Sequence, residues 1–312
     1  MNFLRRNFVY VALLAVFLLF ALFLREEGFL TSNNILNIVI QAAPITVMAV
    51  FLNFVLASQE IDLSLGAVVG LSGVIAAIVI QNGDNAFIAS IAAIFSGFFI
   101  GLVNGLLVNQ LKIPSFLSTL AMLGIVTGIA RWITDLKTFS ITDEKFVSAM
   151  GSGSFFGIPS LVLWTLGIVF LGHILLFNTR FGAWVLAVGD NSAAAESLGI
   201  NVKKVRLLVL ILGSLGASLA GLLYAGRLQS ASYSIGVNDT LTVIAAAVIG
   251  GTSLFGGRAS IYGALAGSVL LAMLVNGLLL AGFSVTQQLI VQGVVLILSM
   301  AVSIRGRGTH VS

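Results

Sequence analysis

Long apolar runs, separated by a few polar residues, fill almost the whole chain and restrict it to a membrane fold. Of the 312 residues, 59% are hydrophobic and only 8% are charged, and the mean hydropathy is +1.13. Soluble globular domains carry about 25% charged residues. A helix of about 20 apolar residues crosses the hydrocarbon core of a bilayer. We therefore expect an all-α, polytopic integral membrane protein.

Ten apolar runs predict about ten transmembrane helices. They cover residues 8–24, 35–57, 63–80, 86–108, 114–134, 160–177, 205–226, 240–254, 261–281 and 286–304. The first run follows Arg5 and Arg6 but precedes no small-residue cleavage site, which favours an uncleaved helix over a signal peptide. The eighth run is short, and a glycine-rich stretch separates it from the ninth.

The basic residues predict the orientation of these helices, because Lys and Arg gather on the cytoplasmic side of short loops. With ten spans both termini are cytoplasmic, and residues 135–159 form the longest loop on the opposite face. The segments predicted to be cytoplasmic hold Arg5, Arg6, Lys112, Arg180, Lys203, Lys204, Arg206, Arg258, Arg305 and Arg307. The opposite segments hold Arg25, Lys137, Lys145 and Arg227, and Arg131 lies near the outer end of its span.

Residues 178–206 form a long polar interruption between two apolar runs. Asp190–Leu198 is predicted to be a short helix, because Asp190, Asn191 or Ser192 can cap its start and Gly199 can end it. A capped helix on the cytoplasmic face suits docking to another protein. A solvated connector is the alternative, and the pattern alone leaves both open.

A second interruption, Gly250–Arg258, contains four glycines within eight residues and must break or sharply bend a helix. It is either a tight cytoplasmic turn or a broken helix beside a translocation path. Irregular backbone at membrane depth has to be buried in protein or line a watery cavity.

A third interruption, Ser58–Gly66, places Glu60 and Asp62 between two spans. Carboxylates inside a membrane are costly and usually functional. At the membrane edge, Asp62 or Ser64 would instead cap the following helix. Asn104 and Asn276 lie within spans, where each needs a partner or lines a polar path.

Several functional classes find no support in the sequence. No nucleophile, base and orienting acid form a catalytic set, no metal-binding pattern occurs, and we expect no bound cofactor. A phosphate-binding G-x-x-x-x-G-K-[ST] loop is absent, so any ATPase is a separate subunit. The net charge of +4 comes from short basic loops and does not indicate nucleic acid. The absence of cysteine excludes disulfides.

These three interruptions carry a resemblance to the membrane permease subunits of ribose-type bacterial ABC importers. Residues 189–200 match G-x-N-x-x-A-A-x-x-x-G-I, and residues 250–260 match G-G-T-S-L-x-G-G-R-G-S except at Ala259. Ile61–Ser64 with Gly66 resembles G-G-I-D-L-S-x-G. Gln59 and Glu60 replace its two glycines, so a glycine-only backbone conformation is not expected there.

The resemblance implies one permease domain over residues 1–312 of the bacterial inner membrane. A second permease, identical or paralogous, would pair with it. Two ATP-binding subunits or a tandem ATPase would dock on residues 178–206, and a periplasmic binding protein would deliver a monosaccharide to the 135–159 and 227–239 loops. Basic residues near the ATPase could also contact anionic membrane lipid.

The resemblance also assigns candidate site residues. The coupling helix would comprise Gly189, Asp190, Asn191, Ala194, Ala195, Glu196, Gly199 and Ile200. Candidates for the path or gate are Glu60, Asp62, Ser64, Asn104, Gly250, Gly251, Thr252, Ser253 and Asn276.

Other functions remain open at this point. A branched-chain amino-acid-type permease shares the residue 189–200 pattern, and nucleosides or a furanose-like signalling molecule are alternative solutes. An ion-coupled secondary transporter would need buried ionisable residues, for which Glu60 and Asp62 are the candidates.

Overall fold

The computed structural model describes residues 8–305, so Arg5, Arg6 and Arg307 of the orientation argument lie outside the described residues. Its apolar helices are α2 (Phe8–Phe23), α3 (Ser32–Ala57), α4 (Leu65–Gln81), α5 (Ala86–Gln110), α6 (Ser115–Thr134), α8 (Ser160–Phe177), α11 (Val202–Leu228), α12 (Asp239–Ile249), α13 (Ile261–Leu280) and α14 (Val285–Arg305). Each overlaps one of the ten predicted runs. The all-α, polytopic fold is therefore confirmed.

The helices differ in whether they can cross a bilayer unaided. Among residues 8–305, six helices are long and apolar enough to do so: α3, α5, α6, α8, α11 and α13. Shorter apolar helices are α2, α4, α12 and the Val285–Val295 part of α14. The 11 residues of α12 span only about 16 Å, roughly half of the hydrocarbon core. The predicted run to residue 254 was too long, because α12 ends at Ile249.

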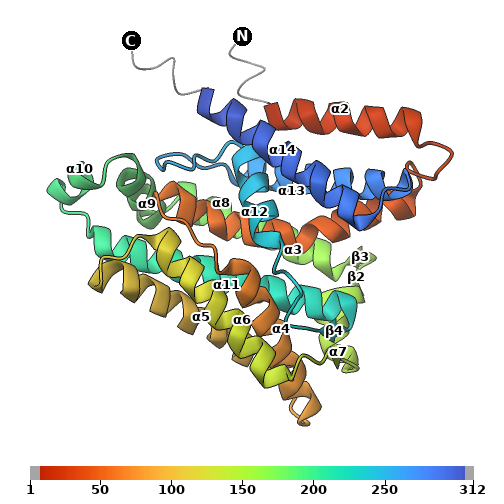
Figure 1. Ribbon diagram of the computed structural model, residues 1–312, viewed down its shortest axis with the longest axis horizontal. Coiled ribbons are helices and arrows are strands. Elements are labelled where there is room, and N and C mark those ends of the chain that lie inside the picture. The colour runs from red at the N-terminus through yellow and green to blue at the C-terminus, as the bar shows by residue number, and fades with distance from the viewer. Residues whose placement is uncertain (1–7, 306–312) are drawn as a thin grey trace.

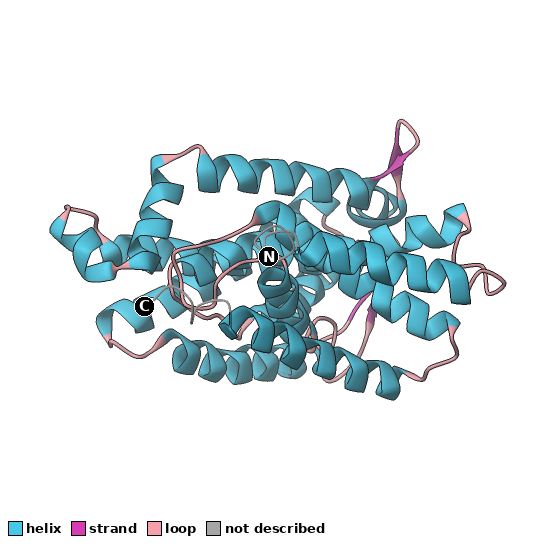
Figure 2. Ribbon diagram, turned by 90° about the horizontal axis from the view of Figure 1, so that it is seen from above, coloured by secondary structure: helices cyan, strands magenta, loops and turns pink. Residues whose placement is uncertain are grey.

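The two ends of the helix bundle carry different small elements (Figure 1). One end, here called the α10 end, carries α9 (Arg180–Asp190) and α10 (Ser192–Ser197). The other, called the β4 end, carries α7 (Glu144–Val147), the π-helix η1 (Ser148–Ser152) and four two-residue strands, β1 (Phe139–Ser140), β2 (Ser154–Phe155), β3 (Ile158–Pro159) and β4 (Ser230–Ala231). Figure 2 shows how little of the molecule these strands occupy.

The two loops predicted to face outward are joined to each other at the β4 end. Strand β1 of the 135–159 loop pairs antiparallel with β4 of the 227–239 loop, with Phe139 opposite Ala231. The Gln81 side chain donates a hydrogen bond of 3.0 Å to the Ser140 carbonyl and ties the pair to the end of α4. The two loops therefore form one connected surface.

Small residues allow α11 to pack closely at the centre of the bundle against α3, α4 and α5. A Cβ atom at Gly97 of α5 would lie 2.6 Å from the Ser214 carbonyl oxygen, and one at Gly101 would lie 2.6 Å from Ile211 Cα. Real side chains do not fit at such distances. Close packing through glycine is a common way for membrane helices to associate, because lipid offers no hydrophobic driving force between them.

Basic residues predicted to share one side do gather at the α10 end. Lys112 follows α5, whose Asn109 donates a hydrogen bond of 2.7 Å to the Lys203 carbonyl at the start of α11. Arg258 follows Gly257, whose backbone N–H donates to the Ala57 carbonyl at the end of α3. The prediction that this end is cytoplasmic rests on these charges.

Helix α3 ends in a left-handed residue that is not glycine. Gln59 has φ of 68°, and the N–H groups of Gln59 and Glu60 donate to the carbonyls of Leu56 and Val55, as in a Schellman motif. The left-handed conformation at this position is therefore kept without glycine. The Schellman motif keeps its geometry, but the left-handed backbone of Gln59 costs free energy that glycine would not lose.

We predict that Gln59→Gly stabilises the protein by about 0.5–1 kcal/mol, because the exposed Gln59 side chain is replaced by the residue that favours its φ. Thermal unfolding in detergent micelles measures the change. Gln110→Gly is the matched control, since Gln110 is an exposed helical residue and glycine lowers stability there. Equal losses at both positions would contradict the prediction.

Candidate functional site

Helix α10 is a short, exposed helix with a well-formed cap at each end. The Asn191 side chain accepts a hydrogen bond of 3.0 Å from the Ala194 N–H, which confirms the predicted cap. Gly199 has φ of 83°, and the Ile200 N–H donates to the Ala195 carbonyl, closing the other end. The predicted start at Asp190 was wrong, because Asp190 is the last residue of α9, a helix that the sequence analysis did not predict.

The side chains of α10 differ sharply in exposure. Ala195 is only 2% exposed and anchors the helix, whereas Ala194 and Glu196 are exposed. Leu198, which directly follows α10, is 82% exposed although it is a large apolar side chain. A single exposed leucine is ordinary on a surface. On a capped helix at one end of a bundle, it provides an apolar contact point.

The end of α9 meets both of the other polar interruptions. A Cβ at Gly189 would collide with the Ala57 carbonyl at the end of α3, and a Cβ at Gly256 would collide with the Gly189 carbonyl. The Gly257 N–H donates a hydrogen bond of 3.0 Å to the same Ala57 carbonyl. Three stretches far apart in the sequence thus share one backbone contact, which is named here the Gly189 junction.

The glycine-rich turn is held by a buried polar network. Thr252 donates a 2.6 Å hydrogen bond to the side-chain oxygen of Asn53 on α3 and accepts one from the Ser260 N–H. The Asn53 amide in turn donates to the Ser260 carbonyl at 3.2 Å. Gly251 adopts φ of 98°, which favours glycine.

The remaining candidates in this turn have packing neighbours. Gly250 packs against the backbone of Gly263 on α13, where neither residue has room for a Cβ. Ser253 is buried, and its N–H donates to the Arg258 carbonyl. The turn therefore connects α3, α9 and α13 at the α10 end.

The loop between α3 and α4 relies on hydroxyl groups of α6 for its hydrogen bonds. The N–H groups of Ile61 and Leu63 donate to the Ser115 and Thr119 side chains, each at 3.0 Å. Thr119 also donates to the Ile61 carbonyl at 3.2 Å. Irregular backbone inside a membrane protein requires such internal partners.

A buried polar chain extends from this loop to α5. Asp62 is fully buried and accepts hydrogen bonds from the Ser64 N–H at 2.9 Å and the Ser64 hydroxyl at 2.6 Å. The Asn104 amide donates to the Ser64 hydroxyl at 3.1 Å. Ser64 precedes α4 but makes no side-chain cap, so the predicted Ser64 cap was wrong; the Gly66 N–H in the first turn of α4 donates instead to the Thr240 hydroxyl at 3.0 Å. Within residues 8–305, Asp62 Oδ2 and Asn104 Oδ1 have no hydrogen-bond partner.

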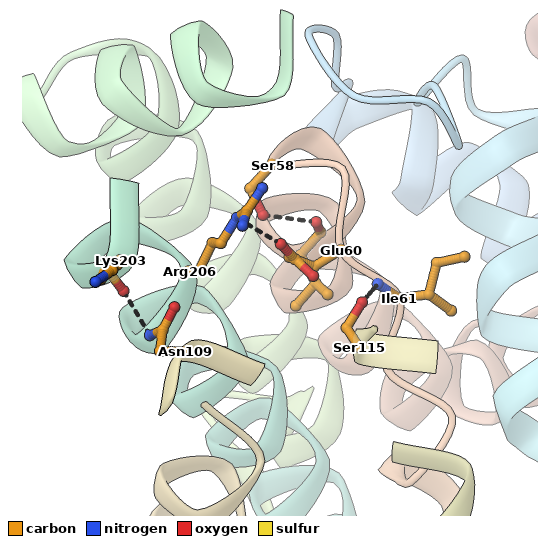
Figure 3. Close-up of polar contacts among 8 residues, drawn as sticks. Ser58, Glu60, Ile61, Asn109, Ser115, Lys203 and Arg206 are labelled. Carbon is orange, nitrogen blue, oxygen red and sulfur yellow. Dashed lines mark hydrogen bonds and ion pairs between the residues drawn. The ribbon is translucent and has the colours of Figure 1, made fainter. Parts of the chain in front are cut away.

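Glu60 and Arg206 form a direct link between the α3–α4 loop and the start of α11. Arg206 Nε lies 2.8 Å from Glu60 Oε1, and the exposed fractions of the two side chains are 34% and 8% (Figure 3). Burial raises the pKa of the Glu60 carboxyl, whereas Ser115 and the positive charge of Arg206 act to lower it. The pair thus joins the loop to the helix that follows α10.

Asn276 lies apart from this assembly. Its amide exchanges two hydrogen bonds with Asn34 of α3, at 2.9 and 3.0 Å. The structure thus brings together the candidates at residues 60–64, 189–200 and 250–253, with Asn104 joined through Ser64, and leaves Asn276 in a separate pair between α3 and α13.

Comparison with known proteins identifies the family. Residues 34–300 match the branched-chain amino acid transport system / permease component family. The chain belongs to this permease family. The ribose import permease of Escherichia coli K12 is 38% identical over 89% of this chain and 87% of its own length. The ribose import permease of Bacillus subtilis is 36% identical over 88% and 86%. The L-arabinose permease of Azospirillum brasilense is 35% identical over 89% and 81%. No solved structure matches the chain.

Membership of this family, with six helices among residues 8–305 able to span a bilayer, makes the chain a multi-pass inner-membrane protein. It also establishes the chain as a permease component of ABC-transporter type. The resemblance inferred from the three polar interruptions is thereby confirmed.

A cavity lined in part by polar side chains lies near the β4 end of the permease and was not predicted from the sequence. The cavity has a volume of about 300 Å³, and among its lining residues are Gln41, Tyr224, Arg227, Asp239 and Gln292. Gln41 and Gln292 lie within predicted spans, where a polar side chain needs a partner or lines a polar path, as for Asn104 and Asn276. No sequence pattern places them beside Tyr224 and Asp239.

Proposed function

We propose that the chain is the permease subunit of an ATP-driven ABC importer that carries a monosaccharide delivered by a periplasmic binding protein. Relatives named as ribose and L-arabinose permeases support the solute class. A second permease, identical or paralogous, completes the path, and two ATP-binding subunits or a tandem ATPase bind at the α10 end.

The observation that carries the proposal is the Gly189 junction. Helix α10 offers Ala194 and Leu198 as exposed contacts, and α9 joins it directly to the end of α3 and to the glycine-rich turn after α12. A movement of α10 under a closing ATPase would therefore move two irregular segments of the bundle. Packed interfaces of this kind switch between discrete arrangements instead of deforming gradually.

Arg206 gives the movement a second route. It lies one turn into α11, which follows α10 along the chain, and holds Glu60 of the α3–α4 loop. Because this loop also carries Asp62, a shift of α11 would act on the buried polar chain through Ser64 to Asn104. The contacts of Gly189 with the end of α3, and of Arg206 with Glu60, would thus carry the movement of α10 into the interior.

Co-purification tests the proposal. The chain is expressed with the genes that neighbour it, and a tag on this chain is used to isolate its partners. We expect an ATP-binding subunit whose ATPase rate rises at least several-fold when a sugar-loaded binding protein is added. Recovery of the chain alone, with solute flux in liposomes that follows an ion gradient, would instead indicate a secondary transporter.

A further inference from the structure

We infer that the polar cavity between α3, α11, α12, α13 and α14 binds the solute during its passage, and that it selects a neutral polyhydroxylated molecule, of which a monosaccharide is the simplest case. This inference rests on the proposed transport function and adds a binding site to it. The cavity volume of about 300 Å³ lies at the lower end of the range of small-molecule sites.

A preformed acceptor stands at one side of the cavity. The Tyr224 hydroxyl of α11 donates a 2.6 Å hydrogen bond to Asp239 Oδ2 at the start of α12. This bond fixes the carboxylate, and an ionised carboxylate has lone pairs to accept further hydrogen bonds from a ligand. Tyr224 also offers an aromatic ring, whose apolar face and polar tip suit a sugar with C–H and O–H groups.

An unused donor stands beside it. Arg227 lies three residues after Tyr224, which places both on one face of α11. Within residues 8–305 its guanidinium makes no ion pair or hydrogen bond, although Asp239 lines the same cavity. Five N–H donors therefore remain available. Arg227 and Asp239 therefore both have hydrogen-bonding capacity left for a solute in this cavity.

Neutral hydrogen-bonding groups form a further part of the lining. Gln41 of α3 and Gln292 of α14 bring amide groups from two further helices, together with Asn238, Thr242 and Gln288. Amides donate and accept, as hydroxyl groups require. The amide groups and the apolar side chains of α13 and α14 that also line the cavity suit the O–H and C–H groups of a sugar. A larger hollow beside α5 is lined mainly by apolar side chains such as Phe87 and Phe95, and no amide side chain is among its lining residues.

The cavity also leads toward the α10 end. A neighbouring cavity of about 420 Å³ shares Asn238, Thr242 and Gln292 with it and reaches Leu63, the residue after Asp62. A solute held at Asp239 would thus lie next to a second cavity that reaches the α3–α4 loop, whose Glu60 pairs with Arg206.

Thiol labelling tests the inference, because the chain has no cysteine to interfere. Gln41→Cys, Gln292→Cys and the control Gln110→Cys are each assembled with the ATPase in nanodiscs and labelled with sulfonatoethyl methanethiosulfonate. Gln110 lies at the exposed end of α5, away from the cavity. We expect binding protein loaded with D-ribose or L-arabinose to slow labelling at residues 41 and 292 about tenfold relative to unloaded binding protein, and not at residue 110.

Transport measurements on Gln41→Leu and Gln292→Leu separate solute binding from occlusion by the binding protein. We expect uptake of the same sugar to fall about tenfold per variant, as the loss of a polar ligand contact predicts, while stimulated ATPase activity persists. Unprotected cysteines or unchanged uptake, with ATPase stimulation intact, would overturn the cavity site alone. If L-leucine slowed the labelling of residues 41 and 292 and the sugars did not, the proposed ligand class would be wrong. Absence of ATPase stimulation by loaded binding protein in the native chain would overturn the proposed function itself.

Discussion

Leu198→Asp is expected to abolish the stimulation of the partner ATPase by loaded binding protein while the permease remains folded. Leu198 is 82% exposed, so its replacement removes little packing from the permease itself. A central apolar contact in an interface typically contributes 2 kcal/mol or more, and its loss would weaken docking by about 30-fold or more. The ATPase rate, with and without binding protein, measures the effect.

Leu111→Asp provides the matched control, because Leu111 is an exposed leucine at the same end but lies outside α10. It should retain stimulation. Full stimulation and normal transport in Leu198→Asp would contradict the assignment of α10 as the coupling helix. Ala194→Glu tests the same surface, whereas a charge at the 2% exposed Ala195 would disrupt the fold and give no information on docking.

Arg206→Ala is expected to lower the free energy of unfolding by about 2 kcal/mol and to uncouple ATP hydrolysis from transport. The substitution leaves the Glu60 carboxylate, only 8% exposed, without its 2.8 Å partner. Removing one member of a buried pair costs more than the pair contributes, because the remaining charge stays desolvated. Since Arg206 is one-third exposed, we expect less than the full penalty of a wholly buried pair.

The double variant Arg206→Ala, Glu60→Gln distinguishes charge desolvation from lost packing. We expect it to recover most of the stability in a thermal unfolding assay, because no unpaired charge remains. Lys204→Ala, which changes an exposed neighbour on the same helix turn, should have little effect on stability. A double variant as unstable as Arg206→Ala would show that the ion pair is not the cause.

The spans, the α10 cap and the family followed from the sequence because each depends on local information. Apolar runs report membrane helices through the cost of exposing polar backbone to lipid. Asn191 and Gly199 mark the ends of α10 through hydrogen bonds to residues three to five positions away. Local reasoning did not predict the left-handed conformation of Gln59, which the Schellman hydrogen bonds at the end of α3 hold although the side chain disfavours it.

Only the tertiary structure decided which of these segments act together. The Gly189 junction joins the ends of α3, α9 and the glycine-rich turn through backbone atoms, and backbone contacts leave no complementary side chains for a sequence pattern to reveal. The pairing of Glu60 with Arg206 and the cavity at Asp239 depend on how α11 crosses α3, α4 and α5. In lipid, that crossing is set by shape and close packing, so the sequence determined the helices and the packing determined the site.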